Sequence, residues 1–146
     1  MSNEKKEPLL RVEDLIVEYT SGGKIIHAVN GVSFDLEEGT TIGLVGETGA
    51  GKTSIAKAIL RVLPDPPAKI KSGSIYLNGE DILKTPEEKM LDIRGDKISM
   101  IFQDPMTALN PTMTIGDQIA EVIALHSDIS KREAHHRAVK MLRKVG

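Results

Sequence analysis

The sequence predicts an α/β fold, and three observations support that prediction. The first third carries strand-like segments with alternating or contiguous apolar residues. A short apolar run then leads through a glycine-rich loop into an amphipathic helix. The last third shows apolar residues at helical spacing. The 146 residues correspond to one domain without cysteine, which excludes a disulfide scaffold and a thiolate metal site.

The first elements are predicted to be strands. The pattern over residues 9–19 and 24–36 indicates two strands with a turn at Gly22-Gly23. Asn30-Gly31 indicates a hairpin turn or a bend within the second of them. Residues 41–45 are apolar without polar alternation, so we interpret them as a strand buried on both faces, as in a parallel sheet.

Helices become more frequent after the glycine-rich loop. A helix is expected from the apolar residues at 55, 58, 59, 62 and 63, and the prolines at 64–67 end it. We then expect a strand at 74–77, a turn at Asn78-Gly79, a short helix at 86–94 and a strand at 97–102. Two helices close the chain, and the second begins with a Ser130/Glu133 capping box. No strand follows them, so we expect the domain to be incomplete.

The glycine-rich loop matches the P-loop pattern G-x-x-x-x-G-K-S/T in full, between a strand and a helix. Its glycines let backbone N–H groups converge on a polyphosphate, and the following helix adds its N-terminal dipole. Lys52 is expected to contact the β- and γ-phosphates, Thr53 to bind Mg²⁺ and Ser54 to bind a phosphate nearer the sugar. The Glu47 side chain is expected to point to solvent. The predicted cofactor-binding residues of the loop and helix start are Gly46, Glu47, Thr48, Gly49, Ala50, Gly51, Lys52, Thr53 and Ser54.

Composition and charge argue against further classes of protein. The formal charge is −2 and aromatic residues make up 3%, which argues against a general nucleic-acid binder. The N-terminus is charged and lacks the apolar run of a signal peptide, so we expect a cytoplasmic protein that meets a membrane only through a partner. A basic segment at residues 131–144 is interpreted as the solvated face of an amphipathic helix, with lipid or nucleic-acid binding as the alternative.

Three stretches resemble the ATP-binding subunit of an ABC transporter, close to the oligopeptide/dipeptide importer branch. They are residues 29–34 with Gly39, the P-loop, and the segment at 101–111, which is similar to the Q-loop of peptide importers; residues 115–119 extend the match. The resemblance covers residues 9–146. It implies an ABC-type P-loop NTPase fold with an antiparallel β section and the start of a helical subdomain. It divides the chain into a tail at 1–8, a β section and P-loop core at 9–103, and a Q-loop with helical subdomain at 103–146.

The resemblance also implies roles for two residues outside the P-loop. Tyr19 stands where the family has an aromatic side chain that stacks on adenine, and a flat ring suits that task. Gln103 matches the Q-loop glutamine, whose amide oxygen joins the Mg²⁺ shell. The implied cofactors are ATP and Mg²⁺. The implied partners are transmembrane permease subunits and a second ATP-binding subunit, which would hold the protein on the inner face of the cell membrane.

Three further family motifs have no match in the sequence: the LSGGQ-type signature, the apolar run ending in Asp-Glu, and the switch histidine. We therefore expect this chain to bind nucleotide without meaningful turnover, and the full-length protein to hydrolyse ATP for peptide import. Two alternatives stay open. One is an ABC ATPase for another substrate, such as nickel or a sugar, or with a role outside transport. The other is a non-catalytic nucleotide-binding module. A GTPase is disfavoured because no Asn-Lys-x-Asp segment is present.

Overall fold

The computed structural model describes residues 7–146, which form two compact units. The first unit ends at Met90, and the second comprises Leu91–Gly146. Most of the predicted tail, residues 1–6, lies outside the described residues, and Pro8 is already buried. The predicted boundary at residue 103 stays a prediction.

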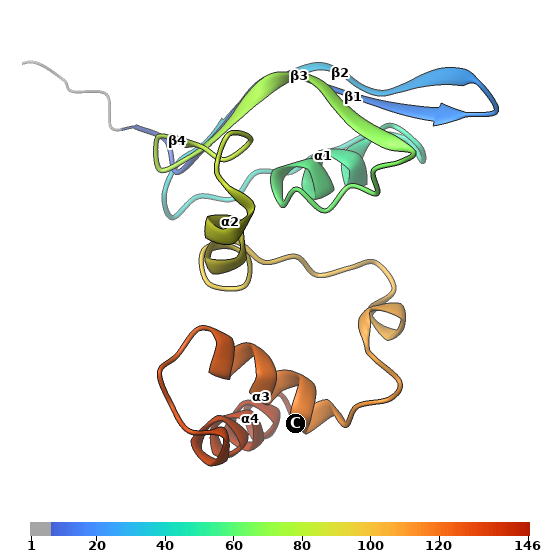
Figure 1. Cartoon of the computed structure of the whole chain (residues 1–146). Helices are drawn as coiled ribbons and strands as arrows, with labels where there is room; N and C mark the ends of the chain where they lie inside the picture. Colours follow the sequence, from blue (N-terminus) through green and yellow to red (C-terminus); the bar gives the residue numbers. More distant parts are fainter. Residues whose placement is uncertain (1–6) are drawn as a thin grey trace, which may run out of the picture. The chain divides into compact units, whose positions relative to one another are not determined.

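The first unit is built on a four-stranded antiparallel sheet with the order β2-β1-β3-β4 (Figure 1). The two long pairings both involve β1, which is hydrogen-bonded to β2 on one side and to β3 on the other. The Asn78-Gly79 turn joins β3 to β4 as predicted, with Leu77 opposite Glu80. The strands are β1 (Leu10–Ser21), β2 (Lys24–Leu36), β3 (Ala68–Leu77) and β4 (Glu80–Asp81).

The hairpin between β1 and β2 turns at Gly22-Gly23, as predicted, because Ser21 pairs with Lys24. Asn30-Gly31 is not a hairpin turn, since β2 continues through both residues. Instead, the register between β1 and β2 shifts around this point, near Leu15 and Ile16. Such an irregularity bends the strand locally without ending it.

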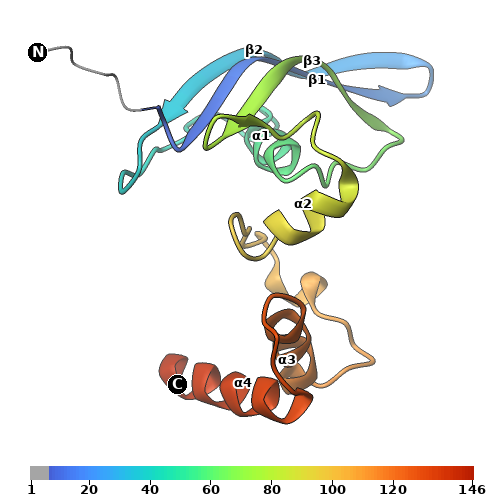
Figure 2. The ribbon, with the colours of Figure 1, turned by 60° about the vertical axis from the view of Figure 1, so that its left-hand side comes forward.

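One face of the sheet is covered by α1 (Lys52–Ile59), as two views of the ribbon show (Figures 1 and 2). Ile55 and Ala58 are the buried residues of this helix, at the spacing that the sequence pattern predicts. They belong to a core that excludes water from the sheet and so holds the start of α1 in place. Its fully buried members on the sheet include Val12, Leu15, Val17 and Ile75.

Two predicted strands are absent from the described residues. Residues 41–45 carry no strand and are exposed, with Val45 at 97%. Residues 97–102 form only an isolated bridge between Arg94 and Ile98, and Ile101 is 94% exposed. An apolar segment becomes a buried strand only when neighbouring strands take up its backbone hydrogen bonds. Neither segment has such a neighbour in the four-stranded sheet, so the apolar pattern alone was an insufficient predictor.

The second unit is helical, and its two long helices were both predicted. Thr114 caps α3 by accepting a hydrogen bond from the N–H of Asp117 at 3.1 Å. Ser130 caps α4 by accepting from the N–H of Glu133 at 3.3 Å, which confirms the Ser130 half of the predicted capping box. Oε1 of Glu133 accepts a hydrogen bond from Arg137. The helices of the chain beyond α1 are α2 (Glu87–Ile93, which includes the boundary between the units), the short 3₁₀ helix η1 (Pro105–Ala108), α3 (Ile115–Leu125) and α4 (Lys131–Val145).

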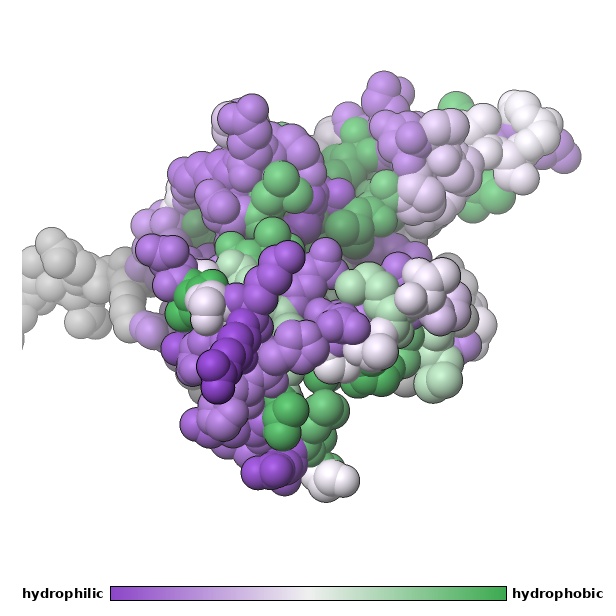
Figure 3. Space-filling model, turned by 60° about the horizontal axis from the view of Figure 1, so that its bottom comes forward, coloured by the Kyte–Doolittle hydropathy of each residue, from purple (hydrophilic) through white to green (hydrophobic). Residues whose placement is uncertain are grey.

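Small residues let α3 and α4 pack closely. Ala120, Ala134 and Ala138 are buried between them, and Ile119 and Ile123 pack around this cluster. The same apolar face of α4 is uncovered toward its C-terminal end. There Met141 and Val145, which follow Ala134 and Ala138 at helical spacing, are 51% and 83% exposed. Figure 3 shows hydrophobic residues (green) and hydrophilic residues (purple) side by side on the face that it draws. Within the part of the chain that the structure describes, no helix has the length and apolar character to cross a membrane.

Candidate functional site: the phosphate loop

The P-loop enters α1 through two left-handed glycines. Gly49 and Gly51 have φ values of 85° and 82°. Gly49 lies inside the turn between Glu47 and Ala50, and Gly51 is the N-cap of α1. The N–H of Ala50 donates to the carbonyl of Glu47 at 3.1 Å, which closes the loop upon itself. This is the backbone conformation for which the sequence pattern selects glycine.

Gly51 also lies directly against β2. A Cβ atom at this position would lie 2.0 Å from the carbonyl oxygen of Ala28 and 3.3 Å from Cγ2 of Val29. Those atoms belong to the strand, so the end of the loop is fixed to the sheet by direct contact. Only glycine fits, for a steric reason as well as a conformational one.

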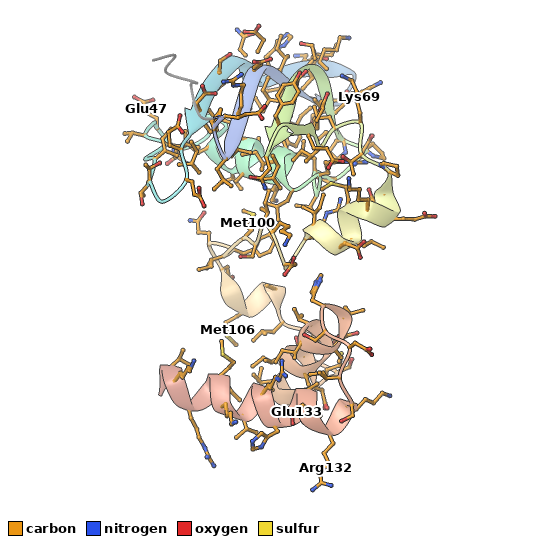
Figure 4. The ribbon with its side chains drawn as sticks, turned by 90° about the vertical axis from the view of Figure 1, so that its left-hand side faces the viewer. Glu47, Lys69, Met100, Met106, Arg132 and Glu133 are labelled. Carbon is orange, nitrogen blue, oxygen red and sulfur yellow. The ribbon has the colours of Figure 1, made fainter. Side chains whose placement is uncertain are left out.

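The ammonium group of Lys52 lies within the loop. Its Nζ donates to the carbonyl oxygens of Gly46 at 2.6 Å and Glu47 at 2.7 Å. The Glu47 side chain itself is exposed, as predicted, and extends away from the loop (Figure 4). Lys52 therefore carries its charge within the loop, while the nearby Glu47 carboxylate is exposed to solvent.

The N-terminus of α1 is open to a ligand. Gly51 is its N-cap and offers no side-chain hydrogen bond to the first N–H groups. The acidic side chains that often occupy a first turn are absent from this helix. Unpaired N–H groups, the helix dipole and Lys52 then act together on any anion bound there. Thr53, which is exposed, and Ser54, which is half-buried, belong to the same first turn.

Tyr19 lies near the C-terminal end of β1, opposite Ile26 of β2 and Ala68 of β3. Its hydroxyl oxygen is 3.3 Å from Oγ of Ser54 on α1. The structure thus brings Tyr19 to the P-loop helix, across 35 positions of sequence. The sequence patterns singled out each residue separately but gave no sign that they touch. The stacking role of Tyr19 stays a prediction, as do the ligand roles of the loop residues.

Gln103 belongs to the second unit, where it is exposed in the segment that precedes η1. Its predicted role at Mg²⁺ stays a prediction. The neighbouring Asp104 accepts a hydrogen bond from the N–H of Met106 at 3.1 Å, so it acts as a local turn former, as expected.

Gln118 on α3 holds the far end of this segment, a role that the sequence patterns did not indicate. Its Oε1 accepts from the N–H of Asn110 at 2.9 Å, and its Nε2 donates to the carbonyl of Asn110 at 3.0 Å. One amide thereby satisfies both backbone groups of a loop residue. The loop that begins at Gln103 is therefore hydrogen-bonded to α3 at its other end, through Asn110.

Comparison with known proteins supplies the family. The ABC transporter family model matches residues 29–146, which is most of the chain. The chain is 46% identical over 138 residues to the oligopeptide transport ATP-binding protein OppD of Bacillus subtilis, covering 94% of this chain and 38% of that protein. It is 45% identical over 140 residues to the dipeptide transport ATP-binding protein DppD of the same organism, covering 96% of this chain and 42% of that protein. The chain therefore spans well under half the length of these relatives.

Solved structures agree on the fold. A bacterial ABC transporter cassette in dimeric form matches with a TM-score of 0.78 and 23% identity, over 92% of this chain and 56% of that one. An ATP-binding cassette dimer bound to ADP and Pi after hydrolysis matches with a TM-score of 0.75 and 20% identity, over the same shares of the two chains. With a P-loop of the geometry described above and a family match over residues 29–146, the chain belongs to the ABC transporter family.

Proposed function

We propose that the chain binds Mg-ATP at the P-loop. The observation that carries the proposal is the arrangement around Gly51 and Lys52. Gly51 fixes the loop to β2 through a contact that leaves no room for a Cβ, and Lys52 places its Nζ between two loop carbonyls. A positive charge and an uncapped helix N-terminus then face the same place. Polyphosphate is the ligand class that this combination fits best.

Different residues of the loop would bind different parts of the ligand. Lys52 and the N–H groups at the start of α1 would bind phosphate oxygens, and the exposed Thr53 hydroxyl would bind Mg²⁺. The proposed Mg²⁺ role of Gln103 is supported only by the resemblance of residues 101–111 to the Q-loop. When bound, Mg²⁺ would neutralise charge on the phosphates. Hard oxygen donors of this kind are what Mg²⁺ prefers, so the donor set fits the ion.

For the longer protein, we propose ATP hydrolysis coupled to peptide import. The support is the similarity to relatives named as oligopeptide and dipeptide transport ATP-binding proteins. Two such subunits would act together with transmembrane permease subunits, and the dimeric form of the matched cassettes supports the pairing. The protein would then lie on the cytoplasmic face of the membrane, attached through its permeases.

For the 146 residues themselves, we propose binding without appreciable turnover. The sequence has no apolar run ending in Asp-Glu and no LSGGQ-type segment after the P-loop. Phosphoryl transfer depends on positioning and charge stabilisation, and a carboxylate that orients water and metal contributes much of both. Phosphate release from ATP by this chain should therefore equal the rate of the Lys52→Ala variant.

Peptide uptake tests the transport role. A bacterial strain without its own peptide-importer ATPase would receive the longer gene that encodes these residues, as wild type or as Lys52→Ala. The proposal expects uptake of a labelled tripeptide with the wild type and none with Lys52→Ala. Lys57→Ala is the matched control, since Lys57 lies in the last turn of the same helix. Wild-type uptake that Lys52→Ala leaves intact would contradict the proposal, and so would restored uptake of nickel or a sugar without peptide uptake.

A further inference from the structure

We propose that Tyr19 and Ser54 form a two-hydroxyl relay, in which the Tyr19 hydroxyl aims the Ser54 hydroxyl at a phosphate of the bound nucleotide. The inference rests on the proposed function, because it concerns the same site. It gives Tyr19 a positioning role towards the phosphates in addition to any contact with the base. The observation is the 3.3 Å separation of the two hydroxyl oxygens.

Both ends of the contact are anchored. Tyr19 lies within β1 between two strands, and the next residue, Thr20, donates its N–H to the carbonyl of Pro67 at 2.9 Å. Ser54 lies in the first turn of α1, just before Ile55, whose N–H donates to the carbonyl of Gly51 at 2.9 Å. The backbone is therefore held in place by hydrogen bonds next to both Tyr19 and Ser54. The two hydroxyl groups therefore meet at low additional entropic cost.

The direction of the hydrogen bond follows from the ligand. Each hydroxyl group has a single proton to donate. If Ser54 gave its proton to Tyr19, it would turn only lone pairs towards an anion at the start of α1. With a phosphate present, the favourable order is Tyr19 O–H to Ser54 Oγ, and Ser54 O–H to the phosphate oxygen. Hydrogen bonds in such a chain polarise and strengthen one another, and the anion reinforces the order.

The relay differs from a stacking platform in a measurable way. A platform needs only the ring, so Tyr19→Phe would preserve it, and it matters only for ligands that carry a base. The relay needs the hydroxyl and acts on phosphate, so it also matters for inorganic tripolyphosphate, which has no base. One hydrogen bond of this type corresponds to roughly a five-fold change in affinity.

The test measures binding of ATP and of tripolyphosphate, both with Mg²⁺, by titration calorimetry. The variants are Tyr19→Phe, Ser54→Ala and the double variant, and each is checked for folding by circular dichroism. Tyr76→Phe is the matched control, because Tyr76 lies on β3 opposite Arg11 and makes no hydrogen bond to the P-loop helix in the described structure. We expect each single variant to weaken both ligands about five-fold. The double variant should be no weaker than Ser54→Ala alone, since the two groups act as one unit.

The outcomes separate the inference from the function on which it rests. Unchanged tripolyphosphate affinity in Tyr19→Phe, or losses that add up in the double variant, would overturn the relay while leaving the nucleotide site in place. Wild-type protein that shows no binding dependent on Lys52 would overturn the proposed function and the relay together. A loss for ATP and tripolyphosphate alike, absent in Tyr76→Phe, is the result that the relay predicts.

Discussion

Replacing Gly51 by alanine should destabilise the fold for two separate reasons, a left-handed backbone conformation and a steric clash with β2. The same replacement at Gly49 measures the first effect alone. Gly51→Ala would keep a left-handed φ of 82° and place Cβ 2.0 Å from the carbonyl oxygen of Ala28. Gly49→Ala is the matched control. Gly49 has a φ of 85°, yet nothing lies within 4 Å of a Cβ built there.

In Gly49→Ala, only the left-handed conformation of the alanine lowers the unfolding free energy, by about 1–2 kcal/mol. Gly51→Ala carries the same penalty plus the cost of displacing a strand carbonyl, which overpacking data put at about 1–3 kcal/mol more. The expected difference in unfolding free energy between the variants is thus about 1–3 kcal/mol. With m-values of about 1–3 kcal/mol per molar urea, the Gly51→Ala midpoint should lie roughly 1 M below that of Gly49→Ala.

Urea unfolding followed by far-ultraviolet circular dichroism measures this difference, and ATP titration of the same samples reports on the loop. Because the displaced atoms belong to β2, Gly51→Ala should lose affinity even where it remains folded. Equal unfolding midpoints for the two variants would contradict this prediction, since they would show that the close approach of Gly51 to Ala28 does not constrain the loop.

Two further predictions concern the helical unit. Ser130→Ala removes the cap of α4 and should lower the unfolding free energy by about 1 kcal/mol, measured by urea unfolding, whereas Ser127→Ala outside the helices should change it little. Hydrogen bonds from Thr114 and then from His135 hold the pKa of Asp117 below its ordinary value of 3.8. Its stabilising contribution is therefore complete above that value and disappears as pH falls through the lowered pKa. Melting temperatures of Asp117→Asn should accordingly lie below wild type at pH 7 and approach it near pH 2, and a constant gap across this range would argue against the network.

Much of this fold was predictable from local patterns. The Gly22-Gly23 and Asn78-Gly79 turns, the amphipathic spacing of α1 and the cap at Ser130 each depend on residues close in sequence, and all are present. The P-loop was predictable for the same reason, because its glycines and Lys52 all lie within seven consecutive residues, 46–52.

The features that the sequence patterns mispredicted or missed depend on contacts between residues far apart in the sequence. The apolar run at 41–45 has the composition of a buried strand, but a strand also needs neighbours, and the sheet order β2-β1-β3-β4 offers it none. The contact between Tyr19 and Ser54 escaped notice because strand and helix meet only after the chain has folded. The double hydrogen bond of Gln118 to Asn110 was hidden for a similar reason: a single glutamine on a helix carries no local signature.

Calorimetric titration of the chain with Mg-ATP, beside Lys52→Ala and Lys57→Ala, decides whether the P-loop is the nucleotide site. We expect saturable binding by the wild type and by Lys57→Ala, and loss of that binding in Lys52→Ala, because Lys52 places its ammonium group against the loop carbonyls of Gly46 and Glu47. Binding that survives Lys52→Ala, or that is lost equally in Lys57→Ala, would contradict the assignment of the P-loop as the nucleotide site.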